Sequence, residues 1–302
     1  MTVIKLIKDR INECFKIDPA KLDLVLCVLL SGGNLLLTDE PGTGKTTLAK
    51  IISDLFSLQY GRIQFTPDIS PTDVTGMNIF NQETKLWELH KGPLFSDLLL
   101  VDEINRALPR TQSSLLEAMA EKQITIDRNT YSLSSNFCVI ATQNPLEEEG
   151  MFDLPSAQKD RFSMNITLNH LSKEDEVSVM LGLFDYHKQT HVATLDDLSL
   201  IKEQIKNIPV NHDVAHYALN IIHSFKSHDE IKNNISLRAG KDLINNARAL
   251  AYINGDQQVL PDHIFTLIKP VLNHRIIINN AYNYDAQRVE DIIDTCIKKV
   301  KP

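Results

Sequence analysis

The sequence predicts an α/β domain built on a parallel sheet, followed by an all-helical domain. From about residue 34 to residue 167, short apolar β-rich runs alternate with segments that have helical spacing. After Ser172 the strand signals stop, while apolar residues still recur at helical spacing in Leu237–Asn254 and Pro261–His274. A change from alternating elements to helices alone is typical of a sheet domain joined to a helical one.

Particular residues mark the expected elements and their ends. Ser172 with Asp175 has the spacing of a capped helix start, and Gly255 follows a helix end. We therefore place the domains at residues 1–170 and 171–302. The five expected strands are Asn34–Thr38, Arg62–Thr66, Leu98–Asp102, Phe137–Thr142 and Asn165–Leu168.

Two stretches within the α/β part have the pattern of hairpin insertions. The first pairs Met77–Phe80 with Lys85–Leu89, and the second pairs Ile124–Asp127 with Tyr131–Leu133. Phe80 and Trp87 on the first hairpin either form an exposed docking surface or pack onto the body of the domain.

Composition bounds the class of protein. The chain has 302 residues, of which 43% are hydrophobic, so it can bury a sizeable core. Its four cysteines lie far apart, and its longest apolar run, Leu24–Leu30, is too short to span a bilayer. We expect reduced thiols, no membrane segment and a cytoplasmic location. Residues 51–200 hold 11 Lys and Arg against 22 Asp and Glu, which makes nucleic acid an unfavourable partner.

The stretch LLTDEPGTGKTT, Leu36 to Thr47, has the features of a phosphate-binding loop. It follows an expected strand and opens an expected helix, where small residues let backbone N–H groups close on phosphate oxygens. Lys45 would neutralise β and γ phosphates, and the Thr46 hydroxyl would coordinate Mg²⁺. The alternative is a glycine-rich turn with an exposed lysine. The candidate nucleotide-binding residues are Pro41, Gly42, Thr43, Gly44, Lys45, Thr46, Thr47 and Asp102.

A pair of carboxylates ends the apolar strand Leu98–Asp102. At the carboxyl end of a parallel strand the chain leaves the sheet beside the phosphate loop. Asp102 can then hold Mg²⁺ through water, and Glu103 can polarise an attacking water. A merely solvated acid pair is the alternative.

Three further polar residues are ambiguous from the sequence. Asn144 ends the next strand and either positions the attacking water or forms an Asx turn before Pro145. Arg161 offers a planar fork for phosphate oxygens, or pairs with Asp160 at the surface. Arg238, at the start of a helix in the second domain, is equally ambiguous between a phosphate contact and a surface role.

Long ordered stretches of the chain resemble the MoxR group of AAA+ ATPases. Besides PGTGKT they include RIQFTPDISPTDVTG from Arg62, KGPLFSDLLLVDEINRALPRTQSSLLEAMAEKQITID from Lys91, VIATQNPLEEEG from Val139 and LPSAQKDRFSM from Leu154. The resemblance covers nearly everything from Asn34 to Ile276. Members of the group commonly carry either Gly or Asp at the position of Asp39, so the resemblance implies that Asp39 is an accepted variant. The alternative is that its charge repels the phosphates and weakens nucleotide binding.

The resemblance implies a role for each candidate residue. Lys45 with Thr46 and Asp102 with Glu103 correspond to the Walker A and Walker B pairs, and Asn144 to sensor 1. Arg161 corresponds to an arginine finger that reaches a neighbouring subunit, and Arg238 to the sensor-2 arginine of the lid. The implied catalytic set is Lys45, Glu103, Asn144, Arg161 and Arg238, with Thr46 and Asp102 holding Mg²⁺.

The implied architecture is a P-loop NTPase core with a five-stranded parallel sheet, order 5-1-4-3-2, and an all-α lid. A trans arginine implies head-to-tail contacts that close into a ring, with a hexamer expected. The implied function is Mg-dependent ATP hydrolysis that remodels or activates client proteins, together with a von Willebrand factor A domain protein. The alternatives are a nucleic-acid-stimulated motor and a nucleotide-gated binding module with negligible turnover.

Overall fold

The computed structural model describes residues 3–39, 42–144, 151–152, 154–168, 172–184, 186–233, 235–278 and 286–300. The chain forms two compact units. The first comprises Met1–Pro19, Asn34–Leu154 and Thr167–Ser199, and the second comprises Ala20–Gly33, Pro155–Ile166 and Leu200–Pro302. The predicted boundary between residues 170 and 171 lies outside the described residues and stays a prediction.

A five-stranded sheet has the order β2-β5-β8-β1-β9. Counted along the chain this is 5-1-4-3-2, which confirms the predicted order. Neighbouring strands run parallel, with Leu35 opposite Ile140 and Leu98 opposite Cys138. The strands are β1 (Leu35–Thr38), β2 (Tyr60–Gln64), β5 (Leu98–Asp102), β8 (Cys138–Gln143) and β9 (Met164–Ile166).

The predicted end of β2 is wrong by two residues. Strand β2 starts at Tyr60, which pairs with Leu98, and ends at Gln64, which pairs with Asp102. Pairing with the neighbouring strand, and not the local run of β-favouring residues, sets these limits. The next residue, Phe65, donates its N–H to the Asp102 carbonyl at 2.9 Å as the chain leaves the sheet.

The central strands are nearly continuous hydrophobic runs. Every residue of β5 is buried, as are Leu35–Leu37 of β1 and most of β8. Such runs are expected where a parallel sheet is covered on both faces. The helix α3 (Lys45–Leu55) buries Leu48, Ile51, Ile52 and Leu55, so the helix expected after the phosphate loop is present and has an apolar face.

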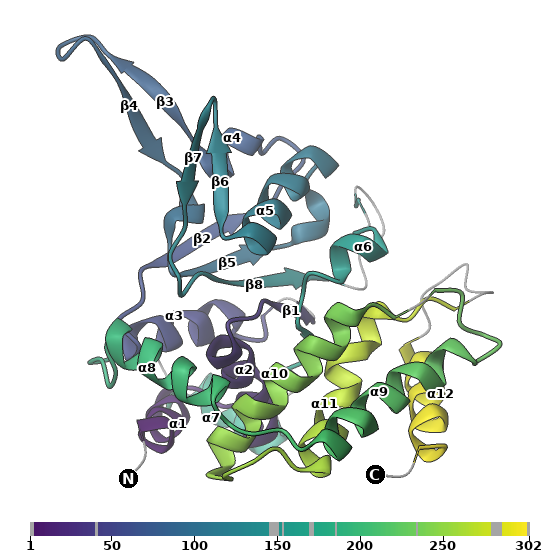
Figure 1. The fold of residues 1–302 in the computed structure, drawn as a ribbon. Helices are drawn as coiled ribbons and strands as arrows, with labels where there is room; N and C mark the ends of the chain where they lie inside the picture. The colour runs from purple at the N-terminus through teal and green to yellow at the C-terminus, as the bar shows by residue number, and fades with distance from the viewer. Residues whose placement is uncertain are drawn as a thin grey trace. The chain divides into compact units, whose positions relative to one another are not determined.

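The other helices and the short 3-10 turns occur in both halves of the chain (Figure 1). The helices are α1 (Val3–Cys14), α2 (Pro19–Ser31), α4 (Pro71–Thr75), α5 (Pro109–Glu121), α6 (Ser156–Lys159), α7 (Lys173–Met180), α8 (Leu195–Lys206), α9 (His212–Lys226), α10 (Leu237–Asn254), α11 (Pro261–Leu272) and α12 (Ala286–Lys298). The 3-10 turns are η1 (Pro93–Phe95), η2 (Ile104–Arg106) and η3 (Asn273–Arg275). No described helix is long and apolar enough to cross a membrane.

The caps of the second half follow the predicted signals. Ser172 Oγ accepts the Asp175 N–H at 3.1 Å at the start of α7. Gly255 ends α10 with φ 82°, a left-handed conformation that glycine adopts without steric cost. The predicted helix Pro261–His274 ends two residues early, because α11 tightens into the 3-10 turn η3.

Both predicted hairpins are present. The first is β3 (Gly76–Asn81) with β4 (Leu86–Lys91), and the second is β6 (Gln123–Ile126) with β7 (Asn129–Ser132). Figure 1 shows the β3–β4 hairpin extending away from the rest of its unit. Phe80 and Trp87 are 42% and 70% exposed, and their rings contact each other at 5.4 Å. Packing onto the body therefore does not account for these two rings.

Candidate functional site

The phosphate-loop sequence forms a tight turn between β1 and α3. Gly42 and Gly44 have φ values of 90° and 79°, which side chains other than glycine rarely adopt. A Cβ at Gly44 would also lie 2.5 Å from the Phe15 ring. The N-cap residue of α3 is Gly44, which has no side chain that could occupy the N–H groups of the first turn. This is the local structure that an anion requires.

Lys45, the first residue of α3, points back over this turn. Its Nζ donates to the Asp39 carbonyl at 3.1 Å. Burial lowers the pKa of Lys45 below 10.5, and the carboxylates of Asp39, Asp102 and Glu103 partly oppose that shift. Because these charges act on the ammonium, Lys45 lies within electrostatic reach of both predicted Walker B carboxylates.

Asp102 is the last residue of β5 and is buried, with 8% of its surface exposed. Its Oδ2 accepts a hydrogen bond from Arg62 Nε at 2.8 Å. Arg62 lies on β2, beside β5 in the sheet, and half of its side chain is exposed. The carboxylate is therefore held by a single-point contact from an arginine that can turn toward solvent.

Glu103 begins the turn out of the sheet in a left-handed conformation, with φ 56° and ψ 54°. Its N–H donates to Thr142 Oγ1 at 3.0 Å, which ties the turn to β8. Its Oε2 accepts from Gln64 Nε2 at 2.8 Å and lies 3.0 Å from Arg106 Nε. Positive φ at a non-glycine residue is strained, and here it directs the carboxylate to the edge where the strands end.

The end of β8 lies beside the phosphate loop. Thr38 and Gln143 are paired in register, and Gln143 Nε2 donates to Thr38 Oγ1 at 2.7 Å. The Asp39 N–H donates to the Gln143 carbonyl at 3.2 Å. Asn144 follows directly, and Pro145 lies outside the described residues, so both interpretations of Asn144 stay open.

The structure thus brings together only part of the predicted set. Lys45, Asp102 and Glu103 lie at one edge of the sheet, and Thr46 and Thr47 occupy the first turn of α3. Pro41 lies outside the described residues. Arg161 and Arg238 belong to the second unit.

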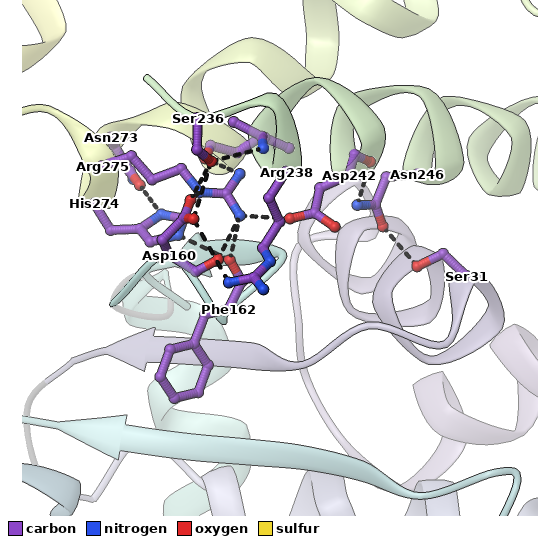
Figure 2. A network of polar contacts seen from close by, with 12 residues as sticks. Ser31, Asp160, Phe162, Ser236, Arg238, Asp242, Asn246, Asn273, His274 and Arg275 are labelled. Carbon is purple, nitrogen blue, oxygen red and sulfur yellow. Dashed lines mark hydrogen bonds and ion pairs between the residues drawn. The ribbon is translucent and has the colours of Figure 1, made fainter. Parts of the chain in front are cut away.

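Asp160, next to Arg161, collects three polar partners within the second unit (Figure 2). Its carboxylate accepts from Ser236 Oγ at 2.9 Å and lies 3.0 Å from Arg275 Nε and 3.7 Å from Arg238 Nη1. Ser236 caps α10, and Arg238 lies in the first turn of that helix. The end of α6, the start of α10 and the turn η3 therefore meet at one carboxylate.

The comparisons with known proteins agree with this geometry. Residues 34–164 match the ATPase family associated with various cellular activities (AAA), and residues 224–296 match the AAA lid domain. Chaperone MoxR1 of Mycobacterium tuberculosis is 34% identical over 92% of this chain and 76% of its own length. The chain belongs to the MoxR group of AAA+ ATPases.

Other relatives of this MoxR-type ATPase cover nearly its whole length. The uncharacterized protein YeaC of Bacillus subtilis is 34% identical over 92% of this chain and 88% of its own length. A crystal structure of a provisionally assigned ATPase from Cytophaga hutchinsonii is 34% identical, with a TM-score of 0.89. It covers 99% of this chain and 94% of its own.

The donor set of the MoxR-type ATPase fits Mg²⁺ bound through a substrate. A hydroxyl on Thr46 and a carboxylate on Asp102 are oxygen ligands, which Mg²⁺ prefers. Among the described residues no group of three or more His, Cys, Asp or Glu could cage a metal ion. Mg²⁺ is commonly held by one or two protein oxygens together with phosphate oxygens and water, which is what this edge offers.

Sequence reasoning missed the residues that hold the carboxylates. Arg62 and Gln64 lie two apart on β2, so they share one face of the sheet, and each contacts one of the pair. The alternation Arg-Ile-Gln beside an apolar strand that ends in acids is a signal that could have found them. Arg275 follows the end of α11 and donates to the Val271 carbonyl of that helix at 3.1 Å, as a residue that caps a helix end does. Nothing in the sequence marked its contacts with Asp160.

Proposed function

We propose that this chain hydrolyses ATP with Mg²⁺ at the edge of its sheet and uses the energy to remodel or activate client proteins. The observation that carries the proposal is the convergence of Lys45, Asp102 and Glu103 beside a helix start that has two left-handed glycines. Positive charge, backbone donors and two carboxylates are the groups that phosphoryl transfer to water needs.

Each residue has a separate task in the proposed reaction. The N–H groups from Gly42 to Thr47 and the Lys45 ammonium hold the β and γ phosphates. Thr46 and Asp102 hold Mg²⁺, which neutralises charge on the phosphate oxygens. Glu103 orients the attacking water and accepts its proton, with Asn144 as its partner in positioning. For this the Glu103 carboxylate must turn from Gln64 and Arg106 toward the water.

Arg161 and Arg238 complete the proposed site from the helical unit. Arg161 acts on the nucleotide of a neighbouring copy, and Arg238 on that of its own chain. Because each copy then supplies one arginine and receives another, the contact is head to tail, and closure gives a ring, which we propose is a hexamer. A trans arginine is worth about 10³ to 10⁵ in rate in other phosphoryl-transfer sites.

The chaperone-like role rests on the relatives. One relative is named chaperone MoxR1, and we extend that activity to this chain, with a von Willebrand factor A domain protein as partner. The four cysteines are buried free thiols, which supports a reducing compartment such as the cytoplasm.

Phosphate release tests the proposal, with Glu103→Gln set against Glu117→Gln. Glu117 is an exposed residue of α5 and serves as a matched control. We expect Glu103→Gln to lose turnover by about 10²- to 10⁴-fold and to bind ATP as tightly as the wild type. Tight ATP binding without turnover by the wild type would instead point to a nucleotide-gated binding module.

A further inference from the structure

Arg275 is the most enclosed charged side chain of the network in Figure 2. Only 2% of its side chain is exposed, in the turn η3 that follows α11. Its Nε lies 3.0 Å from Asp160 Oδ1, and its Nη2 donates to Asp242 Oδ2. Burial raises the pKa of Asp242, while the charge and hydrogen bond of Arg275 oppose the rise. The guanidinium is thus fixed by carboxylates from two different segments.

The same guanidinium holds the backbone on both sides of Arg161. Arg275 Nη2 donates to the Asp160 carbonyl at 3.3 Å and to the Phe162 carbonyl at 2.8 Å. A third donor, Nη1, reaches the Val271 carbonyl at 3.1 Å. Arg161 is the residue between the two clamped carbonyls of the segment, so its Cα has little freedom to move.

Two neighbours reinforce this clamp. His274 Nε2 lies 3.0 Å from the Phe162 carbonyl, and because a carbonyl can only accept, that nitrogen donates. The Phe162 side chain is fully buried and anchors the far side of Arg161. The segment Asp160–Phe162, which we call the finger segment, is therefore held by its backbone, its carboxylate and its aromatic ring.

We propose that Arg275 is a positioning residue for Arg161 in ATP hydrolysis. The inference rests on the proposed function, in which Arg161 serves the nucleotide of a neighbouring copy. A long arginine reaches a transferring phosphate usefully only from a fixed base, because a misplacement of about 1 Å can lower a rate by about 10²-fold. Arg275 supplies that base from a separate helix end.

The test uses Arg275→Lys, with Arg248→Lys as its matched control. Lysine keeps the positive charge that Asp160 and Asp242 face, but one ammonium cannot reproduce the planar fork that spans three carbonyls and two carboxylates. Arg248, in α10 of the same unit, also donates from a half-buried guanidinium to a backbone carbonyl, that of Ile208 at 3.1 Å. It has no described contact with the finger segment.

We expect Arg275→Lys to lower kcat for ATP by about 10- to 100-fold and to leave KM within about threefold, because the nucleotide's own phosphate loop is intact. We expect Arg248→Lys to keep the wild-type kcat. Melting curves of both variants identify any loss of folding. If Arg275→Lys does not fold, His274→Leu, which removes one donor to the Phe162 carbonyl, is measured in its place.

Mixtures of two variants distinguish a positioning role of Arg275 from general damage to the protein. Arg275→Lys is mixed in equal amounts with Lys45→Ala, beside a reference mixture of Arg161→Ala with Lys45→Ala. In each mixture about a quarter of the sites pair an intact phosphate loop with an intact neighbouring finger segment, if copies mix at random. We expect both mixtures to recover the same share of wild-type activity.

The outcomes distinguish this inference from the proposed function. A reference mixture that recovers, beside an Arg275→Lys mixture that does not, would overturn the positioning role alone, as would wild-type kcat in Arg275→Lys. Wild-type turnover by Arg161→Ala would overturn both this inference and the proposed trans role of Arg161.

Discussion

The sheet edge of the first unit and the Arg275 network of the second are both built from carboxylates and arginines. They differ in how exposed these side chains are to solvent. At the edge, Asp102 and Glu103 are held by side chains of β2 and the following turn that are partly exposed. In the network, Arg275 is enclosed and meets two carboxylates and three carbonyls. Contacts that solvent can replace leave a charge available to a ligand, whereas buried contacts to several partners fix a backbone.

The largest effect is expected from the charge at the phosphate loop. Replacing Lys45 by alanine removes the cation that faces the phosphates, and we expect ATP turnover to fall at least about 10³-fold. Lys50→Ala is the matched control, because Lys50 lies on the same helix and contacts the Tyr186 ring instead. Nucleotide titration and phosphate release measure both variants. Equal losses in the two would show that helix damage, and not charge, is responsible.

Buried and exposed arginines should differ sharply in stability. Arg275→Met leaves Asp160 and Asp242 without their buried partner and should lower the free energy of unfolding of the helical unit by about 3–5 kcal/mol. Arg288→Met breaks an exposed pair with Glu230 and should lower the free energy of unfolding far less. Hydrogen exchange of peptides from α10 and α11 measures the loss of stability in Arg275→Met. Similar values for both variants would contradict the contrast between enclosed and replaceable contacts.

The phosphate-binding turn depends on the left-handed backbone of Gly44, so a substitution there should weaken nucleotide binding. Gly44→Ala places a side chain at φ 79° and against the Phe15 ring, so we expect about 1–2 kcal/mol weaker nucleotide binding. Gly42→Ala has the same conformational cost but meets no atom within 4 Å. Adding Phe15→Ala should recover part of the loss in Gly44→Ala and none in Gly42→Ala. Calorimetric titration with ATP measures the difference.

The stability of the Arg275 network should fall at acid pH, because His274 is buried within it. Burial lowers the pKa of His274 well below 6.5, and the charge of Arg275 lowers it further. Below about pH 6.5, His274 binds a proton in the unfolded chain but stays neutral in the folded chain. The contribution of His274 to stability is therefore full above that pH and falls as the pH drops. The loss is at most about 1.4 kcal/mol per pH unit. The melting temperature of His274→Gln between pH 7.5 and 5.5 should fall less than that of the wild type, and parallel curves would refute this origin.

The smallest effect concerns the arginine that holds Asp102. Because Arg62 must release this carboxylate before it can bind Mg²⁺, Arg62→Met should lower the Mg²⁺ concentration for half-maximal turnover by up to about fivefold. Arg110→Met, at an exposed position of α5, serves as the control. A higher Mg²⁺ requirement in Arg62→Met would mean that the arginine assists the site instead of competing with it.

The sequence predicted the sheet edge better than the network, for a physical reason. Lys45, Asp102 and Glu103 lie where strands end, and the ends of parallel strands meet by topology. Arg62 and Gln64 escaped because the limits of β2 depend on pairing with β5, which local composition does not record. Arg275 and Asp160 are 115 residues apart, and a lone arginine after a helix resembles a cap until the packing of that helix is known.

The most direct test of the central claim is ATP turnover per chain as a function of protein concentration, with the assembly mass measured in the same samples. If an arginine from a neighbouring copy completes each site, turnover per chain rises with assembly, and Arg161→Ala assembles without that rise. Full turnover per chain by a dilute monomer would contradict the shared site.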